Sequence, residues 1–181
     1  MESTAVAPGL MRYAMGHFAT GVTVITTLGP AGEPAGCTVS AFCSLSLDPP
    51  LVLVCVGTGR PVQRALERAP GFTVNVLAAH QRDVAAVFAR PGADRFAGLP
   101  TSPGRHGIPR ITGALARIEC DLDVTHAGGD HSIVVGRVRD LATGDGEPLL
   151  YARGAFAALA RDEAPPGTAD LPYDWLLSAR W

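Results

Sequence analysis

The sequence contains no lysine, and all fifteen of its basic residues are arginines. A Schiff-base mechanism and a phosphate-binding P-loop each require a lysine, so the chain lacks the residue for either. Charge is also scarce: charged residues make up 18% of the chain, and the formal net charge is −2. This balance leaves no basic footprint for a nucleic acid and no polybasic segment for a membrane surface. We therefore expect no nucleic-acid partner.

Long apolar runs are missing as well. The longest strong run is Leu51–Val56, far shorter than the roughly 18 residues that span a bilayer. Residues 1–11 lack the basic region and the apolar stretch of a signal peptide, so none is expected. From these absences we predict no membrane partner and a cytoplasmic location.

Motifs for disulfides, metals and acid–base catalysis are absent too. The four cysteines are Cys37, Cys43, Cys55 and Cys120. They have no C-x-x-C spacing and no accompanying histidine cluster, so neither a disulfide nor a metal site is expected. Because each stands among apolar or strand-forming residues, we predict free, buried thiols. The sequence also has no Ser/His/Asp order, paired-carboxylate spacing or H-E-x-x-H motif.

What the sequence does contain is a succession of many short elements. Its 181 residues, 47% of them hydrophobic, suit one domain with its own core. Its 21 glycines and 15 prolines divide the chain into short pieces. The helices predicted from spacing span residues 9–19, 58–69 and 80–90. The predicted strands span residues 22–27, 35–42, 51–56, 71–77, 113–123, 131–141, 148–151 and 155–159, and a loop is expected over 91–109.

This pattern predicts a mainly β fold. Roughly six to eight short strands with a few short helices favour an antiparallel β-barrel with helical plugs, because closing a sheet removes its exposed edges. Gly57–Gly59 leads into Arg60-Pro61 rather than into a dinucleotide-binding fingerprint. We expect residues 1–161 to form one domain and residues 162–181 to form a tail. The run Leu51–Val56 is expected to be a strand buried on both faces.

The densest polar feature is a row of hydroxyls with the two-residue period of one strand face, at Thr38, Ser40, Ser44 and Ser46. Such a row leaves room for a flat ligand, and the backbone of a bend beside it can bind an anion. An ordinary solvent-facing strand would show the same spacing. The residues that follow, Asp48-Pro49-Pro50, force the strand to stop at a defined place, which sets it apart from an ordinary one.

Three further polar residues each have two interpretations. Asn75 lies in an apolar strand and Gln81 opens the following helix. An amide in such a place either satisfies nearby backbone groups or binds the hydrogen-bonding edge of a ligand. Turn chemistry explains Gly128–Asp130, so His131 is either the first residue of a strand or a site residue.

Five segments of the chain carry a family resemblance. They are F-A-T-G-V-T-V-I-T at 18–26, T-V-S-A-F at 38–42, S-L-S-L-D-P-P-L-V at 44–52, F-T-V-N-V-L at 72–77 and G-D-H-S-I at 129–133, with Gly136 after the last. In this order, over residues 10–160, they resemble the short-chain flavin reductases. These are the NAD(P)H:flavin oxidoreductase components of two-component flavin monooxygenases. The resemblance implies an FMN-binding split β-barrel, that is, a closed, antiparallel, Greek-key-like barrel.

The resemblance also implies a function. An NAD(P)H-dependent flavin reductase transfers a hydride from NADH or NADPH to FMN or FAD and supplies reduced flavin to a partner monooxygenase. Relatives are homodimers with each flavin site near the subunit interface, so a homodimer is implied. Two alternatives stay open: an electron-carrier flavoprotein that keeps FMN tightly bound, and a non-enzymatic interaction module whose hydroxyl-bearing strand is only surface.

Site residues follow from the same resemblance. Those expected to bind the flavin are Thr38, Val39, Ser40, Ser44, Leu45, Ser46, Asn75, Val76, Leu77, Gln81, Arg90, Arg95 and Phe96. Within this set, Thr38–Ser40 is expected along the isoalloxazine edge. Ser44–Ser46 is expected at the ribityl chain and the phosphate.

The catalytic candidate is His131, which is expected to face the nicotinamide with Tyr151 close to it. Its implied role is positioning and electrostatics rather than obligatory proton donation. This chain departs from the family pattern at Gly59-Arg60-Pro61, where relatives often have a serine before the helix. Thr58 is expected to supply the missing hydroxyl for phosphate contact.

Overall fold

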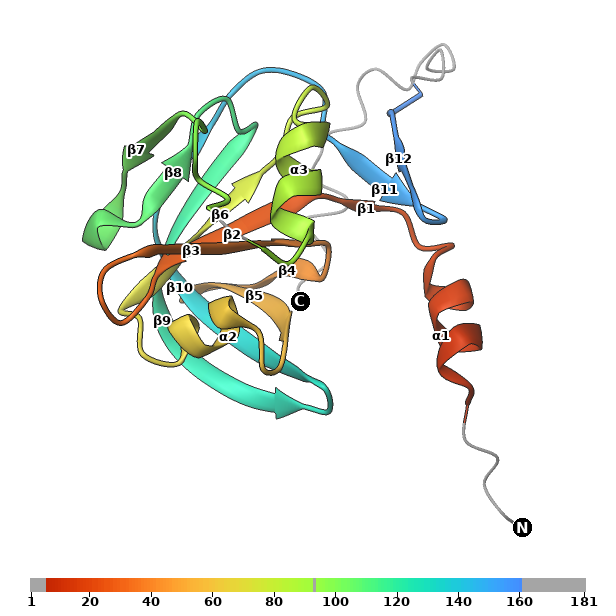
Figure 1. The fold of residues 1–181 in the computed structure, drawn as a ribbon, viewed down its shortest axis with the longest axis horizontal. Helices are drawn as coiled ribbons and strands as arrows, with labels where there is room; N and C mark the ends of the chain where they lie inside the picture. Colours follow the sequence, from red (N-terminus) through yellow and green to blue (C-terminus); the bar gives the residue numbers. More distant parts are fainter. Residues whose placement is uncertain (1–5, 93, 161–181) are drawn as a thin grey trace.

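The computed structural model describes residues 6–92 and 94–160 of the chain. Its centre is a seven-stranded antiparallel sheet in the order β3-β2-β6-β9-β10-β5-β4 (Figure 1). The strands are β2 (Thr23–Leu28), β3 (Pro34–Val39), β4 (Phe42–Leu47), β5 (Pro50–Gly57), β6 (Gly71–Val76), β9 (Ala116–Gly128) and β10 (His131–Thr143). The prediction of a mainly β, antiparallel fold is confirmed. The predicted tail, residues 162–181, lies outside the described residues.

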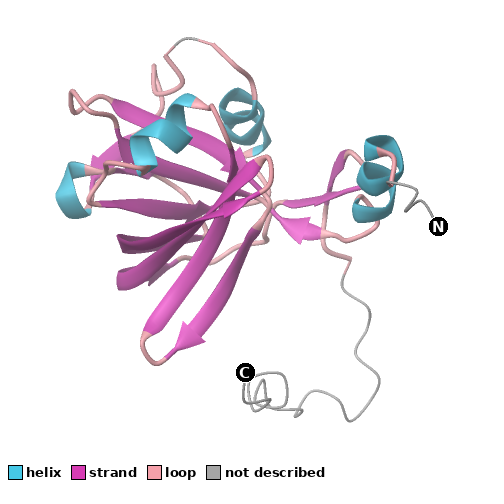
Figure 2. Ribbon diagram, turned by 90° about the horizontal axis from the view of Figure 1, so that it is seen from below, coloured by secondary structure: helices cyan, strands magenta, loops and turns pink. Residues whose placement is uncertain are grey.

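The described part of the chain contains three α-helices, each overlapping a predicted one: α1 (Pro8–Met15), α2 (Pro61–Leu66) and α3 (Arg82–Ala89). Pro61 occupies the first turn of α2, where its fixed φ favours helix initiation and its missing N–H costs nothing. Helices α2 and α3 both pack against β2 and β3. Helix α1 has no buried residue and stands apart from the main sheet (Figure 2).

Two smaller sheets complete the described fold. One joins β1 (Thr20–Gly21), β11 (Leu150–Ala152) and β12 (Ala155–Ala157), which confirms the strand pair predicted near the end of the chain. The other pairs β7 (Thr101–Pro103) with β8 (Pro109–Ile111), and a short 3₁₀ helix at Arg105–Gly107 connects them. The loop predicted over 91–109 is therefore wrong in part. Prolines suggested a loop there, but a two-stranded sheet tolerates them because each strand has a free edge.

The row of hydroxyls predicted on one strand face is divided between two strands. Strand β3 ends at Val39, the chain bends at Ser40–Ala41, and β4 begins at Phe42. The Phe42 N–H donates to the Ser40 carbonyl at 3.0 Å, and the Cys55 N–H donates to the Ala41 carbonyl at 2.9 Å. A bulge between Ser44 and Ser46 then shifts the register of β4 against β5. The prediction of one shared face is wrong, because the bend and the bulge each reset the two-residue period.

Strands β3 and β4 are the two outer strands of the seven-stranded order. They follow one another in the chain and meet at the Ser40–Ala41 bend. Among the described residues no ladder of hydrogen bonds joins them. Closure of the sheet into a barrel therefore stays a prediction.

Strand β5 is buried on one face only. Val52, Val54 and Val56 are buried in the core, whereas the alternate residues Leu53 and Cys55 are partly exposed. The prediction of burial on both faces is wrong, because the apolar run does not distinguish a core face from the wall of a cavity. Leu53 and Cys55 line such a cavity, as described below.

All four cysteines are free, as predicted, but they are not all buried. Cys120 is buried, Cys37 and Cys55 are partly buried, and Cys43 on β4 is exposed. The prediction of a buried thiol is wrong for Cys43, because this residue lines the same cavity as Leu53 and Cys55 instead of facing the core. Within the described residues, no helix is long and apolar enough to cross a membrane.

We expect Cys43 to be the one thiol that reacts rapidly with DTNB in the folded protein at pH 8. Burial raises the pKa of Cys37 to about 11 and that of Cys120 to about 12, and it also raises the pKa of the partly buried Cys55. Because the thiolate is the reactive form, about one Cys37 in a thousand is reactive at pH 8, rising tenfold per pH unit. The release of thionitrobenzoate, followed in time, checks this. The Cys43→Ser variant should lose the fast phase; more than one fast thiol in the unmodified protein contradicts the prediction.

Candidate functional site

Two cavities meet at the bend between β3 and β4. The first, of about 800 Å³, lies between β3, the end of β5, the start of α2 and the segment that follows α3. The second, of about 920 Å³, lies between the bend, β5 and the segment that follows α1. Ser40, Ala41 and Cys55 line both cavities. The bend and Cys55 therefore form a wall that the two cavities share.

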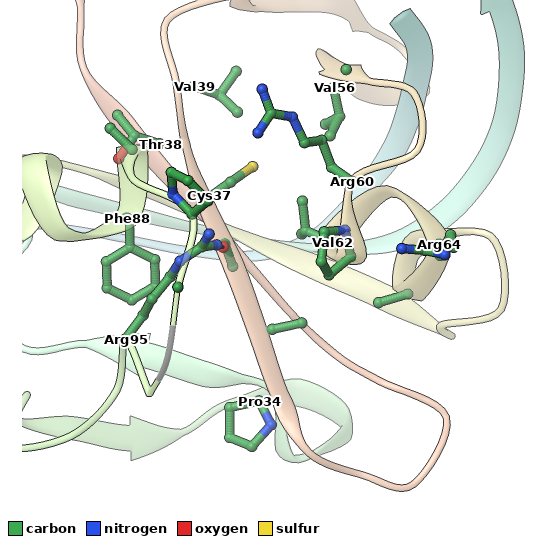
Figure 3. Close-up of a pocket in the computed structure, with 18 of the residues that line it drawn as sticks. Pro34, Cys37, Thr38, Val39, Val56, Arg60, Val62, Arg64, Phe88 and Arg95 are labelled. Carbon is green, nitrogen blue, oxygen red and sulfur yellow. The ribbon is translucent and has the colours of Figure 1, made fainter.

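Arginines approach the first cavity from two sides. Arg60, the residue before α2, and Arg95, from the segment after α3, flank Cys37 of β3 from opposite directions (Figure 3). Their positive charges oppose the rise that burial causes in the pKa of Cys37, so both charges act at the same place in the cavity. Glu33 and Asp94 also line the first cavity, so the part of it that is suited to a negatively charged group is the part between Arg60 and Arg95.

The two arginines are held differently. The Arg95 guanidinium donates to the carbonyls of Gly36 at 2.5 Å and Arg90 at 2.7 Å, which anchors it to β3. Within the described residues, the guanidinium of Arg60 makes no hydrogen bond or ion pair. Arg60 is thus a cation with its hydrogen-bonding capacity available, and phosphate oxygens are the acceptors that a guanidinium matches best.

The second cavity is mainly apolar. Its walls include Met15 and Phe18 near α1, Phe42 of β4 and Leu53 of β5. Arg12 and Arg153 also line it. A flat aromatic ring buries its faces favourably against such side chains, with a polar edge directed to the bend.

His131, the first residue of β10, lines the first cavity at the end formed by Gly57. Its Nδ1 lies 2.7 Å from Oδ1 of Asp130. The hydroxyl of Thr58, which was expected at a phosphate, donates to the Asp130 carbonyl at 3.0 Å. Tyr151, expected close to His131, lines the second cavity instead of the first. The structure therefore places His131 and Tyr151 at different cavities.

Thr38, Val39 and Ser40 all line the first cavity, and Ser40 lines the second as well. The hydroxyl of Thr38 donates to the carbonyl of Ala85 in α3 at 2.7 Å, so it ties α3 to β3. The side chain of Ser40 is exposed at the bend. These three residues are brought together where the sequence predicted a ligand.

Ser44, Leu45 and Ser46 lie on β4 and line neither cavity. Ser44 and Leu45 are exposed and Ser46 is partly exposed. The structure does not bring this group together with Thr38–Ser40, because β4 runs away from the bend along β5. Their role at a phosphate stays a prediction.

Asn75, Leu77 and Gln81 are buried, and none of them lines either cavity. The amide of Asn75 hydrogen-bonds to groups on β2 and β8, and that of Gln81 bonds to the Ala78 N–H and the Thr112 carbonyl. Both amides thus have partners inside the protein, and their role in binding the flavin stays a prediction. Val76, between Asn75 and Leu77, is the member of this stretch that lines the second cavity.

Arg95 and Phe96 line the first cavity, and Phe96 makes an edge-to-face contact with Phe88 at 5.0 Å between ring centroids. Arg90 is exposed and does not line the cavity; its carbonyl anchors Arg95. Two of the three residues predicted on this segment therefore reach the site directly.

Sequence reasoning missed Arg60 and Cys37 as lining residues, and it did not connect Arg12 to the site. For Arg60 the local signal is incomplete: Pro61 marks a helix start, but it does not show that the side chain before it faces a cavity. Cys37 shares a strand face with Val39, but the sequence does not show that this face of β3 lines a cavity. Nothing in the local pattern around Arg12 predicts a distant cavity.

Comparisons with known proteins agree with this geometry. A family model described as a flavin reductase like domain matches residues 15–160. The reductase subunit HsaB of a flavin-dependent monooxygenase from Rhodococcus jostii is 40% identical over 167 residues, 92% of this chain and 85% of HsaB. The FMN reductase (NADH) SmoA from Agrobacterium fabrum is 43% identical over 150 residues, 83% of this chain and 85% of SmoA.

A solved structure is similar over most of its length. The Streptomyces globisporus NADH:FAD oxidoreductase SgcE6, in complex with NAD and FAD fragments, has a TM-score of 0.82 and 38% sequence identity to this chain. The similarity covers 89% of this chain and 99% of SgcE6. With the family match over residues 15–160 and relatives at 40% identity or more, the chain belongs to the flavin reductase family.

Proposed function

We propose that this flavin reductase transfers a hydride from NADH or NADPH to FMN or FAD and supplies the reduced flavin to a separate partner monooxygenase. HsaB is named as the reductase subunit of a flavin-dependent monooxygenase, SmoA as an FMN reductase that uses NADH, and SgcE6 as an NADH:FAD oxidoreductase. The observation that carries the proposal is the pair of adjoining cavities, one with mainly apolar walls and one with Arg60 and Arg95 on either side of Cys37, which share Ser40–Ala41 as a wall.

The residues present fit a flavin nucleotide. The second cavity offers apolar walls to a tricyclic ring, and the first offers the Arg60 guanidinium, which has no partner among the described residues, to a phosphate. When bound, the flavin supplies the hydride acceptor, so the protein needs no nucleophile and no strong acid–base pair of its own. A sequence without a recognisable nucleophile or acid–base motif is compatible with this chemistry.

The chain's own residues bind the flavin and the nicotinamide nucleotide, orient them towards one another and exclude water. We assign Arg60 and Arg95 to the phosphates, the Ser40–Ala41 bend to the edge of the ring, and His131 to the nicotinamide side. Holding two reacting groups about 3–3.5 Å apart in the correct orientation can supply roughly 7–11 kcal/mol of the activation barrier. Positioning alone therefore accounts for a large part of the expected catalysis.

NADH oxidation by the purified protein should saturate with added free FMN or FAD. This is expected because a reductase that delivers its product must take up and release flavin as a substrate. The measurement is the loss of absorbance at 340 nm at several flavin concentrations, repeated with NADPH. Turnover that is indifferent to added flavin would instead support the electron-carrier alternative, in which FMN stays bound. Absence of both turnover and flavin binding contradicts both.

Four further features belong to the same proposal. We infer that the sheet closes as a split barrel between β3 and β4, that residues 1–161 form one domain, and that two copies associate as a homodimer. The exposed apolar residues of α1, Leu10, Met11 and Tyr13, support association of this kind. We also propose a cytoplasmic location; an exposed free thiol at Cys43 is typical of a reducing compartment.

A further inference from the structure

Two arginines line the second cavity, whose walls are otherwise mainly apolar. Arg12 lies on α1, and Arg153 lies in the turn between β11 and β12; both residues are exposed. Within the described residues, no aspartate or glutamate lines this cavity, and neither guanidinium makes a hydrogen bond or an ion pair. The charge of Arg12 reaches Asp130, which lies outside the cavity. The described wall of the cavity therefore carries two positive charges and no carboxylate.

Arg153 has a backbone conformation that arginine rarely adopts. Strands β11 and β12 pair through Ala152 and Ala155, which leaves Arg153 and Gly154 as a two-residue turn. The φ angle is +50° at Arg153 and +80° at Gly154. Glycine, asparagine and aspartate are the residues preferred at such positions, and the side chain of any larger L-residue is crowded by the backbone there. The turn itself would be more stable without an arginine.

The strained turn is fixed beside the second cavity. The N–H of Arg153 donates to the carbonyl of Gly16 at 2.7 Å, which attaches the turn to the end of α1. Strand β11 pairs with β1, and both residues of β1 line the same cavity (Figure 1). Within the described residues, no hydrogen bond or ion pair of the guanidinium compensates for the strain. Uncompensated backbone strain is typical of functional sites, so we expect the side chain of Arg153 to act on what the cavity binds.

The chemistry of flavin reduction gives such a cation a role. Hydride transfer from a nicotinamide delivers two electrons and one proton, so the reduced flavin ring carries a negative charge around N1 until a second proton arrives. The oxidised ring is neutral. A cation beside the ring therefore stabilises the reduced form more than the oxidised form. This attraction is stronger at the wall of a mainly apolar cavity than in water, because the local dielectric constant is lower.

We propose that Arg153, together with Arg12, supplies the positive charge that stabilises the anionic reduced form of a flavin ring bound in the second cavity. The two arginines raise the reduction potential of the bound flavin, and the strained turn holds one of them at the cavity. This role differs from that of Arg60 and Arg95, which are assigned to the phosphates. It rests on the proposed function, because it requires the flavin ring to lie in the second cavity.

The reduction potential of riboflavin, measured free and bound to the full chain without oxygen, tests the proposal. Riboflavin has no phosphate, so contacts between the arginines and a phosphate make no contribution. The difference between the two potentials gives the ratio of the affinities for reduced and oxidised riboflavin, and a tenfold ratio corresponds to about 30 mV for two electrons. We expect the wild type to bind the reduced form about tenfold more tightly than the oxidised form.

Arg153→Asn should lower this ratio about fivefold, and Arg12→Gln should lower it about threefold. Because asparagine adopts a positive φ more readily than arginine, Arg153→Asn should unfold at the wild-type temperature or up to about 4 °C higher. Arg153→Lys keeps the charge and should keep the ratio within about twofold. Arg68→Asn removes an exposed arginine that lines neither cavity and should change neither the ratio nor the unfolding temperature. A purely structural role of Arg153 would change the unfolding temperature and leave the ratio as it is.

Three results overturn the proposal. They are an unchanged ratio in either Arg153→Asn or Arg12→Gln, a loss in Arg153→Lys as large as in Arg153→Asn, and riboflavin that binds in neither form. If the ratio is unchanged and the variants weaken the binding of FMN alone, the two arginines bind the phosphate instead. The proposed function fails separately: if the ratios are as expected but the wild type oxidises neither NADH nor NADPH with any flavin, the reductase function is wrong while the electrostatic role of Arg153 stands.

Discussion

Arg60→Glu should weaken the binding of FMN and FAD about 100-fold. The substitution removes a charge-assisted hydrogen bond, which contributes about 1.5–3 kcal/mol, and places a carboxylate opposite the phosphate. Arg60 is the sensitive position because its guanidinium has no other partner among the described residues, whereas Arg95 is anchored by the carbonyls of Gly36 and Arg90. The quenching of flavin fluorescence in a titration measures the dissociation constant without any contribution from NADH.

The ligand series gives this prediction its specificity. Riboflavin has no phosphate, so its affinity should change less than threefold in Arg60→Glu. Arg68→Glu makes the same change in net charge at an exposed position just beyond α2 and should leave all three affinities unchanged. Equal losses for riboflavin and FMN in Arg60→Glu would show that the variant disturbs the cavity as a whole and would remove Arg60 from the phosphate site.

Ser46→Glu decides between two placements of the phosphate. The family resemblance places the ribityl chain and phosphate at Ser44–Ser46, which line neither cavity. The arginines of the first cavity offer a different place. A strong loss of FMN affinity in Ser46→Glu, together with an unchanged Arg60→Glu, supports the placement from the resemblance. The opposite pattern supports the arginine cavity, since repulsion by a carboxylate falls off steeply with distance in water and salt.

The sequence predicted the elements of this fold better than their arrangement. Runs of β-branched residues and proline at a helix start are local signals, so β2, β6 and α2 could be predicted within a few residues. The bend at Ser40–Ala41 has no glycine or proline to mark it. It depends on a hydrogen bond from Cys55, fourteen residues away in the chain from Ala41, to the Ala41 carbonyl. No residue at the bend indicates the end of a strand, so the two-residue alternation of side chains was extended across Ser40–Ala41. All four hydroxyls were therefore predicted on one strand face.

The candidate site was predictable only where its residues lie close together in the sequence. Thr38–Ser40 line a cavity as expected, and so does His131. Arg60 and Arg95 come from separate segments, and only the packing of α2 and α3 against β3 brings them to the same cavity. The sequence pattern around Arg60 or around Arg95 does not show that the two side chains reach the same cavity. The resemblance supplied Arg95, and the structure was needed for Arg60.

Asn75 is the residue whose substitution should cost the most stability. Its side chain is fully buried, and its amide nitrogen donates to the Val24 carbonyl at 3.0 Å and the Thr26 hydroxyl at 3.2 Å. Its amide oxygen accepts from the Ile111 N–H at 2.8 Å. The side chain thus joins β6 to β2 and β8, and all of its partners are inside the protein.

Asn75→Leu should lower the free energy of unfolding by about 3–4 kcal/mol. Leucine has the same branching, although its methyl groups are bulkier than the amide atoms, and it leaves the Ile111 N–H without its acceptor. A buried group left unpaired costs about 1–3 kcal/mol, and fitting a larger side chain into a packed core adds to this cost. With roughly 2–4 °C lost per kcal/mol in a chain of this size, Tm should fall by about 6–16 °C at fixed protein concentration. Thermal unfolding followed by circular dichroism measures the shift.

Thr73→Val is the matched control, two residues earlier on the same face of β6. Among the described residues, the hydroxyl of Thr73 is buried and has no hydrogen-bond partner, so an apolar side chain of the same shape should be neutral or stabilising. Flavin titrations well below Tm then separate the two interpretations of Asn75. If Asn75→Leu loses stability while the folded protein keeps its flavin affinity, the amide serves the fold. If Tm is unchanged and flavin affinity falls, Asn75 binds the ligand, and its internal hydrogen bonds contribute nothing measurable.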